Sequence, residues 1–75
     1  MAWIKIRQGE IINANAVKHV IIQMYRDISV SYSIKFYLNG NENFSTKRFE
    51  QFEECREVFN RIWSALADGL SVDIS

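Results

Sequence analysis

Proline is absent from this 75-residue sequence, and glycine, cysteine and histidine are scarce. The single cysteine, Cys55, cannot form an internal disulfide, and small secreted domains usually depend on such bridges. We therefore expect a cytoplasmic protein. Cys55 and the only histidine, His19, fall short of the roughly four ligands of a structural zinc site, which excludes that class of metal site.

Long apolar runs and closely spaced glycines are missing as well. The longest aliphatic run is Val20 to Ile22, so the sequence predicts no membrane span and no signal peptide. Gly9, Gly40 and Gly69 lie too far apart to form a phosphate-binding loop. We expect no cofactor and infer no small-molecule substrate.

The net charge is zero, because nine Lys and Arg balance nine Asp and Glu. This balance excludes the whole-molecule attraction that draws strongly basic proteins to nucleic acid. Residues 1–48 carry seven basic and three acidic side chains, whereas residues 49–75 carry two basic and six acidic ones. A solvated helix face is a better explanation than a cation site for the carboxylates of Glu50, Glu53, Glu54 and Glu57.

The composition is that of a folded chain, with 48% hydrophobic and 24% charged residues, and its length fits a single domain, 1–75. Before residue 48 apolar and polar residues alternate, most clearly from Val30 to Leu38, as is typical of strands with one buried face. Asn39-Gly40 predicts a type I′ hairpin turn after that segment. The strands that we expect span residues 3–7, 11–12, 17–25, 30–38 and 42–47.

After Phe49 the apolar spacing changes to about 3.6, which predicts a helix over about 50–68, capped by Gly69. Residues 71–75 are expected to form a short tail. The apolar stripe that should face the sheet consists of Phe52, Cys55, Phe59, Ile62, Trp63 and Leu66. The predicted fold is α+β, an antiparallel meander of four or five strands followed by one C-terminal amphipathic helix packed on one face.

A single helix covers one face of a sheet, so the other face should stay open. Strand alternation assigns a mixture of aromatic, basic and aliphatic side chains to that face. This candidate interaction face consists of Trp3, Lys5, Arg7, His19, Ile21, Tyr25, Lys35 and Tyr37. A face of this kind can bind a protein, can stack on bases, or can stabilise the sheet with no specific partner.

We expect a non-enzyme. The only possible thiol dyad, Cys55 with His19, would use a cysteine on the buried stripe, where burial raises the pKa of a thiol and lowers its reactivity. The leading hypothesis is a small protein-interaction domain that binds a protein partner or forms a homodimer through the open sheet face or edge. A head-to-tail contact between basic sheet and acidic helix is also left open. Nucleic-acid binding ranks second, given the zero net charge. That alternative would use Trp3, Lys5, Arg7, Lys35 and Tyr37.

The segment from Phe44 through Leu66, a strand leading into an acidic amphipathic helix with Trp63 near its end, resembles the C-terminal end of pleckstrin-homology-like domains. In that family the terminal helix plugs the open end of a bent sheet, and a helix tryptophan anchors it. The resemblance implies a strand meander closed by one helix. The family's seven-stranded barrel and the basic loop between its first two strands have no counterpart here, so phosphoinositide binding is not implied.

Overall fold

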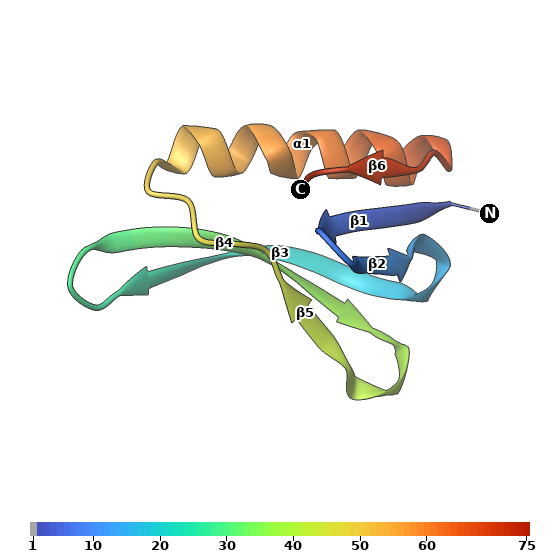
Figure 1. Ribbon diagram of the computed structural model, residues 1–75, viewed down its shortest axis with the longest axis horizontal. Helices are drawn as coiled ribbons and strands as arrows, with labels where there is room; N and C mark the ends of the chain where they lie inside the picture. Colours follow the sequence, from blue (N-terminus) through green and yellow to red (C-terminus); the bar gives the residue numbers. More distant parts are fainter. Residues whose placement is uncertain (1) are drawn as a thin grey trace.

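The computed structural model describes residues 2–75 as six strands and one α-helix, which confirms the α+β class (Figure 1). Two short 3-10 helices, η1 and η2, connect strands. In chain order the elements are β1 (Trp3–Arg7), β2 (Glu10–Asn13), η1 (Ala14–Ala16), β3 (Val17–Arg26), β4 (Val30–Leu38), η2 (Asn39–Asn41), β5 (Asn43–Ser45), α1 (Phe52–Asp68) and β6 (Val72–Asp73).

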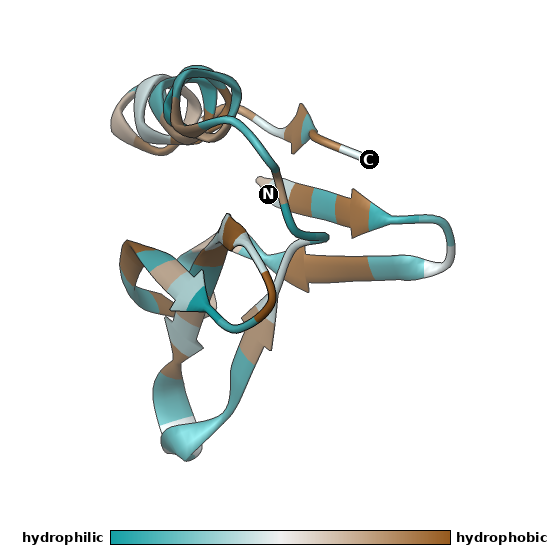
Figure 2. Ribbon diagram, turned by 90° about the vertical axis from the view of Figure 1, so that its left-hand side faces the viewer, coloured by the Kyte–Doolittle hydropathy of each residue, from teal (hydrophilic) through white to brown (hydrophobic). Residues whose placement is uncertain are grey.

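The strands form two three-stranded sheets, in the orders β2-β1-β6 and β3-β4-β5, where the sequence suggested one continuous meander. The break falls at η1, where the Asn13 side chain accepts a hydrogen bond from the backbone N–H of Asn15 at 2.9 Å. This local bond turns the chain away from β2, so β3 pairs with β4 and not with β2. Figure 2 shows α1 and the two sheets on three sides of a common core.

The last residues are not the expected tail, because β6 pairs with β1 in parallel, with Ile4 opposite Val72. Gly69 caps α1 in the left-handed conformation (φ 70°), as expected, and the chain then reverses its direction. The backbone N–H of Ile74 donates to the Lys5 carbonyl at 2.9 Å, and the Ile74 side chain is buried. The period-two spacing of Val72 and Ile74 was the sequence signal for this strand.

The strands β4 and β5 pair antiparallel, as predicted, but the turn that joins them is longer than the predicted type I′ turn. Gly40 and Asn41 both have positive φ angles, of 82° and 67°, and the Leu38 N–H donates to the Glu42 carbonyl at 2.8 Å. Asn tolerates the left-handed conformation better than most residues, so the turn extends over the three residues Asn39–Asn41. The strand β5 accordingly begins at Asn43.

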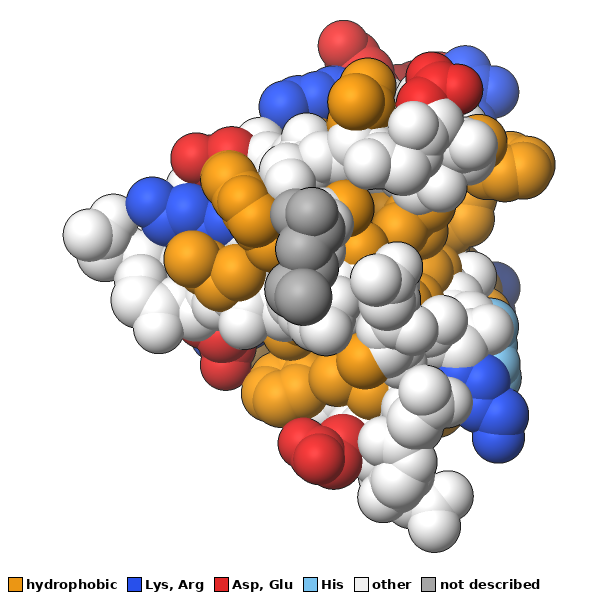
Figure 3. Space-filling model, turned by 90° about the vertical axis from the view of Figure 1, so that its right-hand side faces the viewer, with side chains coloured by type: hydrophobic (Ala, Val, Ile, Leu, Met, Phe, Trp, Pro, Cys, Tyr) orange, Lys and Arg blue, Asp and Glu red, His pale blue; other side chains and the backbone are white. Residues whose placement is uncertain are grey.

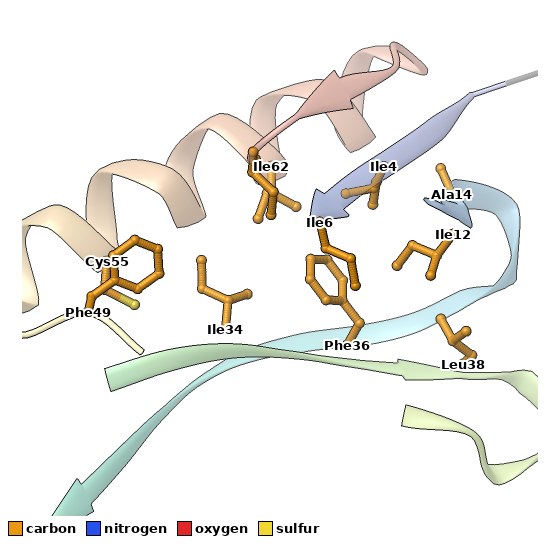
Figure 4. Packing of buried hydrophobic residues seen from close by; sticks show 11 residues of the cluster. Ile4, Ile6, Ile12, Ala14, Ile34, Phe36, Leu38, Phe49, Cys55 and Ile62 are labelled. Carbon is orange, nitrogen blue, oxygen red and sulfur yellow. The ribbon is translucent and has the colours of Figure 1, made fainter. Parts of the chain in front are cut away.

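The core contains the inward-facing residues of both sheets and one side of α1 (Figure 4). The alternation predicted for β1 and β4 is confirmed, because Ile4, Ile34 and Phe36 have no exposed surface. Figure 4 shows Ile34 and Phe36 rising from β4 toward α1 and β1. The remaining buried members of the cluster are Ile6, Ile12, Ala14, Leu38, Phe49, Cys55, Ile62 and Ile74.

Two members of the predicted helix stripe are exposed, Phe52 by 42% and Trp63 by 60%, and Phe59 and Leu66 are partly buried. The buried residues of α1 are Cys55 and Ile62 of the predicted stripe, together with Ala65, which was not assigned to it. Successive residues are about 100° apart around a helix, so Trp63 lies about a quarter turn beyond Ile62, at the margin of the helix surface that packs against the core. The expectation that Trp63 is buried was therefore wrong, and it does not anchor the helix in the core.

Candidate functional site

Five of the eight residues of the candidate interaction face lie together on β3 and β4, on the side of that sheet away from α1. His19 is opposite Tyr37, and their rings stack with centroids 4.4 Å apart. Lys35 is opposite Ile21, and the Lys35 Nζ atom lies 5.3 Å from the centre of the Tyr37 ring. The fifth residue, Tyr25, lies near the other end of β3. These contacts make a stripe of aromatic, aliphatic and basic groups on the sheet.

The polar side chains around Tyr25 mostly contact one another. The Arg48 guanidinium lies 3.9 Å from the centre of the Tyr25 ring and forms an ion pair with Asp27 at 2.9 Å. This hydrogen bond from Arg48 lowers the pKa of the Asp27 carboxyl. The Ser33 hydroxyl donates to the Tyr25 hydroxyl oxygen at 3.2 Å. Because these groups already have partners within the chain, they offer little to an outside ligand.

The other three predicted residues, Trp3, Lys5 and Arg7, lie on β1 in the other sheet, so the expected face is divided between two sheets. Arg7 forms an ion pair with Glu10 at 3.0 Å, and its guanidinium also donates to the carbonyl of Ser45 on β5. Arg7 therefore contacts both sheets. Its charge is largely used within the chain.

A groove that the sequence did not reveal separates α1 from β3 and has a volume of about 480 Å³. It opens because α1 packs chiefly over β4 and reaches β3 less extensively. Figure 3 shows hydrophobic side chains gathered in the middle and upper right of the surface at the end of α1. The groove is lined by Ala14, Val17, Lys18, His19, Val20, Phe59, Ile62, Trp63, Leu66 and Ala67.

The strand on the other side of this groove, β3, is ten residues long and forms an edge of its sheet. The register between β3 and β4 shifts between Val17 and His19, so the strand contains a bulge at Lys18. The bulge places Val17 and Val20 on the same side of the sheet, the side that faces α1. Met24, two residues beyond Ile22 on that side, remains 46% exposed. An apolar strip thus follows the open edge.

Cys55 and His19 do not form a dyad. Cys55 is fully buried on α1, and burial raises the pKa of its thiol, with a smaller contribution from the Glu54 charge. His19 is exposed on β3 and stacks on Tyr37. Among residues 2–75, no cluster of three or more His, Cys, Asp or Glu side chains is arranged to hold a metal ion. None of the described residues belongs to a helix that is long and apolar enough to cross a membrane.

Comparisons with known proteins do not assign the chain to a family. No family model matches the sequence, and no solved structure matches it significantly. A segment of 38 residues is 42% identical to UDP-N-acetylenolpyruvoylglucosamine reductase from Aliivibrio fischeri. This segment is 51% of the chain but only 11% of the reductase. The likeness to this reductase is thus confined to a short piece of that enzyme, and it shows neither a shared family nor a shared activity.

Proposed function

We propose that this chain is a small, non-enzymatic protein-interaction domain of the cytoplasm that binds its partner at the groove between α1 and β3. The observation that carries the proposal is the exposure of Trp63, 60%, at the rim of an apolar groove of about 480 Å³. Single exposed apolar residues are common on folded proteins. Trp63 differs because Phe59, Leu66 and Val20 continue its apolar surface into the groove.

Tryptophan is also the side chain that most often contributes a large part of the binding energy at protein interfaces. A large aromatic ring beside a concave apolar surface gives a partner both a pocket and an anchor. The buried, raised-pKa thiol of Cys55 supports the non-enzymatic part of the proposal, because the protonated thiol is a poor nucleophile.

The proposal is tested by panning a display library of random peptides against the full chain and measuring the affinity of the selected peptides by calorimetry. We expect Trp63→Ala to weaken binding at least about tenfold, as the loss of an anchoring aromatic does. Trp3→Ala is the matched control, because Trp3 is also partly exposed but lies on β1. A failure to select any binding peptide, or equal effects of the two substitutions, would contradict the proposal.

Nucleic-acid binding remains the second candidate, and the observation in its favour is the stacked pair of His19 and Tyr37 beside the Lys35 ammonium. Stacked rings and a nearby cation are what an unpaired base prefers to contact. The test is the fluorescence anisotropy of a labelled single-stranded oligonucleotide at increasing salt. Binding that weakens steeply with salt and is lost in Tyr37→Ala would support this candidate. The protein-interaction proposal expects no binding at moderate salt.

A further inference from the structure

Resting on the proposed function, we propose that the partner is an extended segment of another protein that adds to the free edge of β3 as a fourth strand. Its alternate side chains are apolar and enter the groove beside Trp63, and it carries at least one acidic residue close to Lys18 or Arg26. The inference joins three features of this part of the molecule: an open edge, an adjoining apolar groove, and a charge of one sign along the edge.

The edge is available along nearly the whole of β3. Within residues 2–75, the strand has β4 on one side and no strand on the other. From Lys18 to Arg26, none of the backbone hydrogen bonds found within residues 2–75 joins β3 to an element other than β4. In an antiparallel pair every second residue directs its N–H and C=O groups away from the partner strand. These outward groups of β3 can therefore bind the backbone of an added strand.

The groove lies where the side chains of an added strand would fall. Side chains of a strand point alternately to the two faces of its sheet. On the α1 side, every second side chain of the added segment would meet the apolar wall formed by Phe59, Trp63 and Leu66. The other side chains would extend the opposite face, beside Ile21, which is partly exposed there. Backbone pairing and apolar contacts thus act on the same segment.

The charges along β3 indicate an acidic partner. Lys18 and Arg26 are the charged residues of the strand, and both are basic. Lys18 is also the only charged residue among those that line the groove. The nearby carboxylate of Asp27 already pairs with Arg48. A segment with Asp or Glu opposite Lys18 or Arg26 would be attracted to these basic side chains, whereas a basic segment would be repelled.

The same charges disfavour a second copy of this chain as the occupant. The antiparallel pairing of two β3 strands that overlaps them most fully is centred on Ile22. It places Lys18 of one copy opposite Arg26 of the other, and like charges directly opposite one another are destabilising. A segment of different sequence is free of this repulsion.

The test uses peptides selected from the random library against the full chain, and their analogues N-methylated at single backbone positions. N-methylation removes one donor without altering the protein, so folding of a variant is not at issue. If the peptide adds to β3, methylation at alternate positions should weaken binding about tenfold, and methylation at the positions between them should have little effect. Amide exchange of residues 19–25 should slow in the complex.

A charge-reversed protein completes the test. At least one of the two substitutions Lys18→Glu and Arg26→Glu should weaken an acidic peptide about tenfold at low salt, whereas Lys47→Glu, at an exposed lysine that follows β5, should leave the binding nearly unchanged. Selected peptides that bind without the alternating effect of methylation, or that contain no acidic residue, would overturn the inference but leave the protein-interaction function standing. A concentration-dependent dimer that protects β3 would also overturn it, in favour of self-association. The absence of any peptide binding would contradict both proposals.

Discussion

The two long strands of the β3-β4-β5 sheet have similar alternating sequences but are buried to very different degrees. On the side that faces α1, Ile34 and Phe36 of β4 have no exposed surface. Their cross-strand partners on β3, Ile22 and Val20, are only partly buried. The next residue of β3 on that side, Met24, is 46% exposed. Residues that are neighbours on the same face thus differ because of what lies above them.

The difference follows from the dimensions of the elements. A helix with its side chains is about 10–12 Å wide, and neighbouring strands lie about 4.8 Å apart, so one helix covers roughly two strands. The sheet β2-β1-β6 closes the core on another side through Ile4, Ile6 and Ile12. With the helix placed mainly over β4, the strand β3 is left at the margin. The uncovered strip is the surface that we propose binds a partner.

The largest expected effect compares the directly opposed pair Ile34 and Ile22. Ile34→Ala should lower the free energy of unfolding by about 3 kcal/mol, because it removes a fully buried side chain and leaves a cavity. Ile22→Ala should cost only about 1 kcal/mol, since its side chain is partly exposed already. Urea unfolding followed by circular dichroism measures both values. Equal costs would mean that α1 covers the two strands equally.

The next effect concerns Cys55, which is fully buried at the centre of the helix contact. Cys55→Ser should destabilise the protein by about 2 kcal/mol, because the hydroxyl loses its hydrogen bonds to water. Cys55→Ala should cost less, since it adds no polar group. Burial raises the pKa of the thiol, so iodoacetamide at pH 8 should modify the folded protein much more slowly than the unfolded protein. Rapid modification of the folded chain would contradict the burial of this side of α1.

A smaller effect tests the helix margin above β3. Trp63→Ala should change the free energy of unfolding by less than about 1 kcal/mol, because most of the ring is in contact with solvent. Thermal unfolding of this variant and of Ile34→Ala shows directly which substitution destabilises the protein more. Retention of stability together with loss of peptide binding would show that Trp63 serves a partner. A large loss of stability would place the ring in the core instead.

The outer side of β4 offers a matched pair of buried serines. Ser33 donates a hydrogen bond to Tyr25, whereas the Ser31 hydroxyl has no partner among the described residues. Ser33→Ala should therefore cost about 1 kcal/mol. Ser31→Ala should leave stability unchanged or raise it by up to about 1 kcal/mol, because it removes a buried polar group that is not satisfied. Urea unfolding distinguishes the two, and equal costs would mean that Ser31 has a partner in solution.

The sequence predicted the elements that depend on local patterns and missed the features that depend on how those elements are placed. The alternation in β4, the helix and the Gly69 cap were predicted because each is encoded within a few residues. The division into two sheets and the pairing of Val72 with Ile4 bring together residues far apart in sequence. The groove was missed for the same reason. Its only local signal was the position of Trp63 at the margin of the apolar stripe.

The smallest expected effect lies at the hairpin end of β3 and β4, where Asp27 pairs with Arg48. The hydrogen bond from Arg48 lowers the folded-state pKa of Asp27 below its ordinary value of 3.8. The pair therefore stabilises the fold above about pH 3.8, and the contribution is lost as the pH falls through the lower folded-state pKa. Asp27→Asn should be slightly less stable than the wild type at pH 7, and the difference should vanish in strong acid.

Urea midpoints measured across this pH range provide the check, with Asp68→Asn as control, because Asp68 forms no ion pair within residues 2–75. The effect should be small, since both partners of the pair are more than half exposed and water and salt screen their attraction. A difference that grew toward low pH would reverse the sign and rule out the ion pair as its cause. A large difference at pH 7 would mean that the Arg48 contact with Tyr25 also depends on Asp27, which would make this end of the β3 edge more rigid than its exposure indicates.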